Sequence, residues 1–243
     1  MNKFILPIVA LLHFSGSFAQ SDTINTESQN LNLNHLPFGG SKYLVYYEDV
    51  NGEKTGNTEI WERICTSNKK NNELQFSWKW HVNDSLQAET VHSCNAQTLA
   101  PTFRNMKFNG NNVAFAMDND SIKAVDSIPN NYAIHYPNRA NTTNLLSWEL
   151  DLETLACLPI KKVNQIFEIS FFDFNEQETK YHQYIVEKEA LITIAGEPLK
   201  CWILRIDYNN LEHAQFWISQ NNPETLKMIG YSENLRRHKI KLY

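Results

Sequence analysis

Two histidines and an aspartate form the first group in this sequence that could do chemistry. His81 and His92 flank a turn at residues 83–86, and Asp84 lies between them. Two imidazoles and a carboxylate are ligands that transition metals accept. However, His81 falls on the polar side of an alternating segment, and the spacing is wider than in compact ligand sets. We therefore interpret both histidines as solvent-facing side chains, and the sequence predicts neither a metal nor another cofactor.

A second group consists of acidic residues in the middle of the chain. Its members are Glu149, Asp151, Glu153 and, further along, Asp173. A pair of carboxylates about 5–10 Å apart hydrolyses glycosidic bonds when a sugar-binding groove holds the substrate between them. No serine-hydrolase elbow, zinc-protease motif or phosphate-binding glycine loop accompanies these acids. The sequence favours a non-enzymatic protein and leaves an envelope hydrolase acting on carbohydrate or peptide as a further alternative.

The clearest apolar pattern is at residues 74–82, where apolar and polar residues alternate without interruption. A strand repeats every two residues, so the apolar side chains share one face. Its members are Leu74, Phe76, Trp78, Trp80 and Val82. This face either packs in a core or lines a cavity for an apolar guest. Each large buried side chain contributes about 1.5–3 kcal/mol, so stability alone could account for it.

We expect the face to be mostly filled, with a smaller cavity near Trp148. The candidate ligand-binding residues are Trp61, Phe76, Trp78, Trp80 and Trp148.

The elements that must position these residues are mostly strands. Asn-Gly at 51–52 is a strong hairpin signal, and similar turns recur about every 10 residues. The expected strands are 43–48, 57–66, 74–82, 86–94, 101–108, 113–117, 121–125, 165–172, 180–189, 191–194, 199–208, 214–219, 226–232 and 238–242. Apolar residues at three- and four-residue spacing predict one short helix over 145–156, before Pro159.

The predicted fold class is therefore all-β with one short helix, a long antiparallel meander curled into an open or half barrel. Residues 41–243 form a single β-rich domain in this interpretation. The alternative is two lobes divided near the loop at 127–143.

The first 19 residues have the pattern of a signal peptide. Lys3 precedes a short apolar stretch, and Ser17 and Ala19 place small residues at the cleavage positions. A bilayer needs about 20 apolar residues, so this stretch is too short to span one, and no transmembrane segment is predicted. Residues 20–40 read as a flexible leader. The sequence predicts a periplasmic or extracellular protein, cleaved after Ala19.

The charge pattern excludes a bulk attraction to nucleic acid, because the formal net charge is −5. The one basic cluster is 236–239 with Lys241, which we interpret as a solvated strand face or, alternatively, a contact for phosphate or anionic lipid. Four cysteines could form two disulfides or remain buried thiols, and both alternatives stay open. They are Cys65, Cys94, Cys157 and Cys201.

Several segments, taken in order, resemble a family of uncharacterised exported Bacteroidetes proteins, a DUF3108-like domain of unknown function. They are Tyr-Leu-Val-Tyr-Tyr at 43–47, Trp-Glu-Arg at 61–63, Trp-Lys-Trp-His at 78–81, Trp-Glu-Leu-Asp-Leu-Glu-Thr at 148–154, Cys-Trp-Ile-Leu at 201–204 and Phe-Trp-Ile-Ser at 216–219. That family has no established activity, so the resemblance implies architecture.

The hairpin at 216–229 is also distantly similar to that of LolA/LolB-type periplasmic lipoprotein carriers. These fold as incomplete barrels in which helices close an apolar concavity that holds acyl chains. This chain differs in having one helical segment and an additional meander. The leading hypothesis is a non-enzymatic envelope protein that binds a lipid or another apolar small molecule on the concave face. The alternative is a domain that binds another envelope protein through its convex surface or an edge strand.

Overall fold

The computed structural model describes residues 21–28, 30–118, 120–140, 145–172, 180–194 and 196–242. The predicted signal peptide lies outside these residues. The strands are β1 (Ser21–Ile24), β2 (Gly39–Glu48), β3 (Lys54–Asn68), β4 (Glu73–Val82), β5 (Ser85–Asn95), β6 (Pro101–Phe108), β7 (Asn111–Met117), β8 (Ser121–Ala124), β9 (Arg139–Ala140), β10 (Leu146–Ser147), β11 (Ile166–Phe172), β12 (Lys180–Ile194), β13 (Glu197–Asp207), β14 (His213–Ser219), β15 (Thr225–Tyr231) and β16 (Arg236–Lys241). The helical segments are the 3-10 turns η1 (Leu33–His35), η2 (Tyr132–His135) and η3 (Trp148–Leu150), and the helix α1 (Asp151–Ala156).

The strands of the described residues belong to one 16-stranded sheet made of two meanders, β2–β9 and β11–β16. β16 pairs with β2 and joins the meanders, so strands from the two ends of the described chain lie side by side near the middle of the sheet. All pairings between strands are antiparallel except those of β1 and β10 with β11. The predicted class, an all-β half barrel with one short helix, is confirmed.

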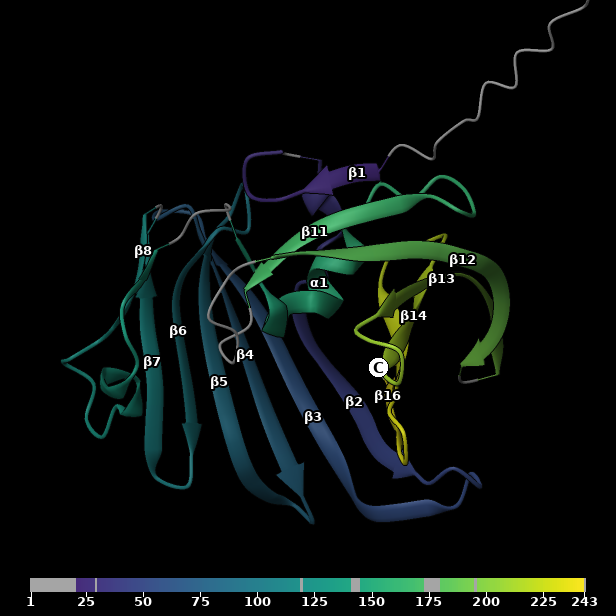
Figure 1. The fold of residues 1–243 in the computed structure, drawn as a ribbon, viewed down its shortest axis with the longest axis horizontal. Coiled ribbons are helices and arrows are strands. Elements are labelled where there is room, and N and C mark those ends of the chain that lie inside the picture. The colour runs from purple at the N-terminus through teal and green to yellow at the C-terminus, as the bar shows by residue number, and fades with distance from the viewer. Residues whose placement is uncertain are drawn as a thin grey trace, which may run out of the picture.

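The sheet curves around α1, which lies inside the curve between the two meanders (Figure 1). The main apolar core fills the space between the concave face and this helix. From the helical segment it takes Leu150, Leu152 and Leu155, each no more than 3% exposed. The concave face of β4 supplies Leu74, Phe76 and Trp78 to the same core. The first three apolar residues of the predicted face are therefore core, Trp80 is partly buried against it, and Val82 lies outside it.

A β-bulge between Val186 and Lys188 divides β12. One extra residue turns the following side chains to the opposite face of a sheet. Val186 is in the main core, whereas Ala190 and Ile192 pack in a second cluster with Ile203 and Trp217. The two strands predicted at 180–189 and 191–194 are one continuous strand, and the bulge lies within the first of them.

Two predicted segments differ from the structure. The leader at 20–40 is not flexible over its described part, because Ser21–Ile24 pairs with β11 and Ile24 is fully buried. The expected helix over 145–156 is shorter: Leu146–Ser147 is a strand, η3 follows, and α1 spans six residues. No helix among the described residues is long and apolar enough to cross a bilayer.

Candidate functional site: a groove at the open end of the half barrel

Two acidic residues of the helical segment are held by bases on the concave face of the sheet. Arg104 of β6 binds Glu149 with both ends of its guanidinium fork, at 3.0 Å from Nε and 2.7 Å from Nη2. His92 Nε2 of β5 lies 2.7 Å from the second oxygen, Oε2. Burial raises the pKa of Glu149, but the hydrogen bonds and charges of His92 and Arg104 outweigh it and hold the pKa at about 2.

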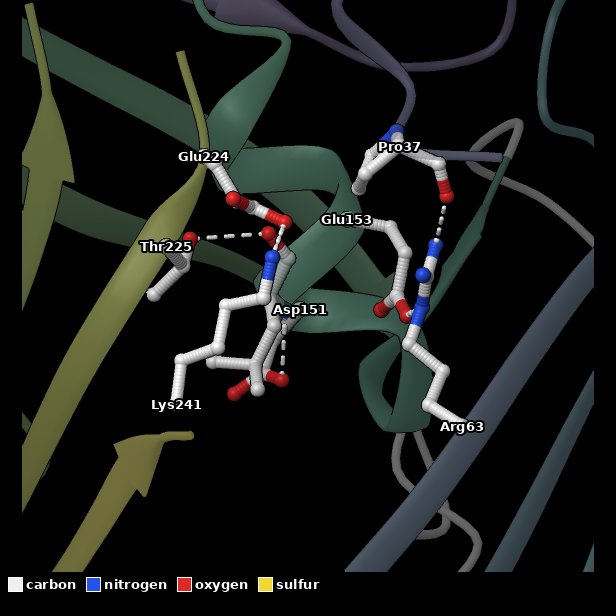
Figure 2. Close-up of polar contacts among 8 residues, drawn as sticks. Pro37, Arg63, Asp151, Glu153, Glu224, Thr225 and Lys241 are labelled. Carbon is white, nitrogen blue, oxygen red and sulfur yellow. Dashed lines mark hydrogen bonds and ion pairs between the residues drawn. The ribbon is translucent and has the colours of Figure 1, made fainter. Parts of the chain in front are cut away.

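The second acid, Glu153, forms a buried ion pair with Arg63 of β3. Arg63 Nη2 also donates to the carbonyl oxygen of Pro37 at 2.8 Å. In Figure 2, Glu153 points toward Arg63, whereas Asp151 leaves the helix on the side of β16. The two carboxylates therefore do not face one common cleft. Asp173, the fourth predicted acid, lies outside the described residues.

Asp151 is the third acid of the helical segment, and it interacts over a longer range with two bases of β16. Burial raises its pKa, as does Glu153, while Lys239, the backbone N–H of Leu152 and Arg237 oppose the rise. Lys239 is 7% exposed, and its ammonium lies over the rings of Trp61 and Trp78, 4.2 and 5.3 Å from their centroids. Burial lowers the pKa of Lys239 to about 8.

The predicted ligand-binding aromatics fall into two groups. Phe76 and Trp78 are 0% and 3% exposed. Trp61 makes edge contacts with Trp78 and Trp80, at centroid separations of 6.0 and 5.1 Å. Trp148 is separate, because its neighbours are Phe171, His182 and Tyr208, at 5.3, 4.6 and 5.7 Å. Of the five predicted residues, Trp148 is the one that lines the groove described next.

This groove has a volume of about 770 Å³ and lies at one end of the half barrel, above the helical segment. Ligand pockets commonly measure about 300–1,000 Å³ and include the mouths of β-barrels. Its walls come from Trp148 and from strands β2 and β12–β16. The lining side chains that face inward include Tyr47, Trp148, His182, Ile206, Tyr208 and Arg237. The arrangement combines the aromatic surface of Trp148 and Tyr208 with charged side chains. These are the cations Lys180 and Arg237 and the acids Asp207 and Glu212.

A row of paired residues forms the floor of the groove. Ile206 pairs with Ala214, Ala214 with Gly230, Gly230 with Arg237, and Arg237 with Tyr47. Paired residues of neighbouring strands project from the same face, so this row crosses five strands on the concave side. Gly230 lines the groove and leaves space beside the larger residues, whereas Ala214 is fully buried in the main core.

Arg237 is partly buried. Its backbone pairs with Gly230 and Tyr47, while its guanidinium makes no hydrogen bond or ion pair with the part of the chain that the structure describes. Its positive charge nevertheless affects the pKa values of two neighbouring tyrosines. Burial raises the pKa of Tyr208 and of Tyr47, and the Arg237 guanidinium opposes both shifts. A guanidinium in this setting can bind a carboxylate or phosphate through two parallel hydrogen bonds.

The interpretation of both histidines as solvent-facing is wrong for His92, which is fully buried against Glu149. A bulge follows Trp80 and leaves His81 partly exposed, with Nε2 3.7 Å from Glu62. Within the described ranges, no three His, Cys, Asp or Glu side chains are grouped so that they could hold a metal ion. All four cysteines are buried and free.

Sequence reasoning missed Tyr47, Tyr208 and Arg237 as groove residues. A signal was present for two of them. Tyr208 ends the alternating face that begins at Trp202, and Arg237 belongs to the basic cluster. Their convergence with Trp148 depends on the pairing of β16 with β2, which no local pattern encodes.

The fold and the groove define a class: an all-β half barrel with an internal helix and an aromatic-lined mouth. No family model matches the sequence, and no curated protein matches it. Among solved structures, the chain is similar to "Beta-barrel-like Protein of Domain of Unknown Function DUF1849 from Brucella abortus", with 12% identity, coverage of 84% of this chain and 97% of that one, and a TM-score of 0.49. At that level the likeness carries no argument about function.

Proposed function

We propose that this chain is an exported, non-enzymatic binding protein of the cell envelope, and that the groove above Trp148 holds a lipid-like small molecule. One observation carries the proposal: a groove of about 770 Å³ opens onto Trp148 and Tyr208 at the mouth of the half barrel. The family resemblance to exported DUF3108-like proteins and the distant similarity to lipoprotein carriers remain expectations in keeping with this role.

The packing of the concave face narrows the place where a ligand would bind. Leu150, Leu152 and Leu155 already cover the apolar face of β4. Trp78 and Trp80 of that face both contact Trp61 of β3, and the Lys239 ammonium lies over Trp61 and Trp78. An apolar group would therefore bind over Trp148, and not along the apolar face of β4.

Hydrolysis has less support. Glu149 with a pKa of about 2 is ionised at neutral pH and cannot act as a general acid there. Glu153 is neutralised by Arg63. Ion pairs of this kind attach the helix to the sheet, which is a structural role.

The test uses a neutral fluorescent probe of apolar surfaces, Nile red, titrated into the mature protein and two glycine variants. Gly230→Val places a side chain in the floor of the groove, where an added Cβ meets the flexible end of Met228 at 3.3 Å. Gly40→Val is the matched control, because its Cβ makes an ordinary 3.9 Å contact with Arg63 O. We expect saturable binding to the wild type and to Gly40→Val, and at least tenfold weaker binding to Gly230→Val. No saturable binding to the wild type would refute the proposal.

A second candidate function is protein interaction. It is favoured by exposed apolar side chains around η2, where Tyr132, Ile134 and Tyr136 are 53%, 55% and 48% exposed. A photo-reactive residue at position 134 should then give a discrete cross-linked partner in native cells. The same photo-reactive residue in place of Ile64, a side chain that is 46% exposed and lies on β3, serves as the control.

A further inference from the structure

We propose that Arg237 is an anion-binding residue and that the groove takes an amphiphile with an acidic head group, such as a carboxylate or phosphate. This inference rests on the proposed function and specifies its ligand class. The observation behind it is the juxtaposition of a guanidinium without a side-chain partner, the adjacent Gly230 and an aromatic wall in one groove.

Two cations line the groove, Arg237 and Lys180 at the exposed start of β12. Arg237 is the one that is partly buried and paired with Gly230. Lys241, two residues further on, is paired with Glu224. Lys239 is buried against Trp61 and Trp78. Asp151 influences both Lys239 and Arg237 but lies within ion-pair distance of neither. Of these two cations, only Arg237 lines the groove.

The acidic residues at the rim are engaged elsewhere. Asp207 forms an ion pair with Arg205 at 2.7 Å, on the convex side of β13. Glu212 accepts a hydrogen bond from Asn209 Nδ2 at 2.9 Å within the turn that follows. Neither carboxylate is in contact with Arg237, so an anion entering the groove meets no acid already bound to the guanidinium.

The shape of the floor gives the head group its place. Gly230 pairs directly with Arg237, and Ala214 is the next residue in the row. The space above Gly230 is therefore bounded on one side by the guanidinium. Trp148 and Tyr208, whose ring centroids are 5.7 Å apart, supply an apolar surface for the remainder of the molecule. Arginine binds planar anions with two donors, and aromatic rings accept an alkyl chain or a ring.

The experiment compares ligands that share a tail and differ in the head group. Dodecanol, dodecanoate and dodecyl phosphate, each below its micelle concentration, compete with Nile red for the protein, and inorganic phosphate alone is titrated by calorimetry. Charge-assisted hydrogen bonds contribute about 1.5–3 kcal/mol, which corresponds to at least a tenfold change in affinity. We expect both acidic amphiphiles to displace the probe at least tenfold better than dodecanol, and inorganic phosphate to bind much more weakly than dodecyl phosphate.

Variants identify the residue responsible. Arg237→Gln should bring the acidic amphiphiles to the level of dodecanol. A far-ultraviolet circular dichroism spectrum and a urea midpoint equal to those of the wild type show that the variant is folded. Arg237→Lys should retain part of the preference, and rising salt should weaken dodecanoate but not dodecanol. Arg205→Gln, on the opposite face of β13, is the matched control and should retain the full preference.

Each contrary outcome has a distinct meaning. Equal displacement by all three amphiphiles in the wild type would overturn this inference and leave the proposed function standing. Inorganic phosphate binding as tightly as dodecyl phosphate would show that a free anion, and not an amphiphile, is recognised. A preference that survives Arg237→Gln would place the anion site elsewhere. Absence of Nile red binding to the wild type would overturn both proposals.

Discussion

Arg63 on β3 and Glu153 on α1 form an ion pair in which each side chain is 1% exposed. The two residues are 90 positions apart in the sequence. Because Arg63 also binds the carbonyl of Pro37, one side chain connects the segment before β2, the sheet and the helix. Removal of either partner would leave a charge in the core without its counter-ion.

Arg63→Met should strongly destabilise the protein. Breaking a buried pair by removing one partner typically costs about 3–5 kcal/mol, because the remaining charge is desolvated and unpaired. Urea unfolding followed by circular dichroism measures the loss. Lys79→Ala breaks a surface pair with Glu89, at 3.6 Å, and should cost less than about 1 kcal/mol. Equal losses in the two variants would contradict a central role for the Arg63–Glu153 pair.

Glu149 should make stability fall in acid. Its pKa in the folded protein, about 2, lies below its ordinary value of 4.5, so its contribution is complete above about pH 5 and is lost as the pH falls toward 2. The loss should be about 1–3 kcal/mol, since the side chain is still 27% exposed. Glu149→Gln should be less stable at pH 7 and show a flatter acid limb in urea unfolding. An unchanged acid limb would show that Arg104 and His92 do not hold this carboxylate.

Lys239 should make stability rise with pH in the alkaline range. Burial lowers its pKa from 10.5 to about 8, so between about pH 8 and 10.5 the unfolded chain binds more protons and stability rises with pH. The expected gain from pH 8 to 9.5 is about 1–2 kcal/mol. Lys239→Met should abolish the gain, whereas the surface variant Lys79→Met should keep it. A rise that persists in Lys239→Met would assign it to another group.

The four cysteines should be unreactive in the folded protein. Burial raises the pKa of Cys65 and of Cys201 to about 11 and that of Cys157 to about 12, and raises that of Cys94 further. The reactive thiolate is therefore scarce at pH 8. A thiol reagent should count no cysteine in native protein and four after denaturation without reductant. Two or fewer after denaturation would show that disulfides form.

Much of the fold could be predicted because its strands alternate locally. The face from Leu74 to Trp80 was identified from spacing alone, and the turns follow Asn and Gly residues. The part of the fold that the sequence did not predict consists of contacts between distant segments. The pairing of β16 with β2 and the burial of Ile24 against β11 depend on contacts between distant segments. Residues 21–24 look polar in sequence, and one buried isoleucine gives little signal.

The candidate site was predicted less completely for a related reason. Trp78 and Trp148 are both tryptophans in apolar segments of the sequence. In the structure Trp78 is in the filled core, whereas Trp148 lines the groove. The basic cluster was interpreted as one solvated face, whereas alternation divides it. Arg237 and Lys239 face the interior and Arg236 faces outward. The face of β16 that points inward depends on how the sheet curves around α1, and the local sequence does not determine that curvature.

The junction between β16 and β2 has a consequence for the order of folding. Its hydrogen-bonded side chains, Glu48 and His238, are 190 positions apart. A chain emerging in sequence order exposes the edge of β2 until residues 236–241 have followed, and contacts of such separation form slowly. The N-terminal meander therefore keeps the edge of β2 unpaired until the last strand of the sheet has formed.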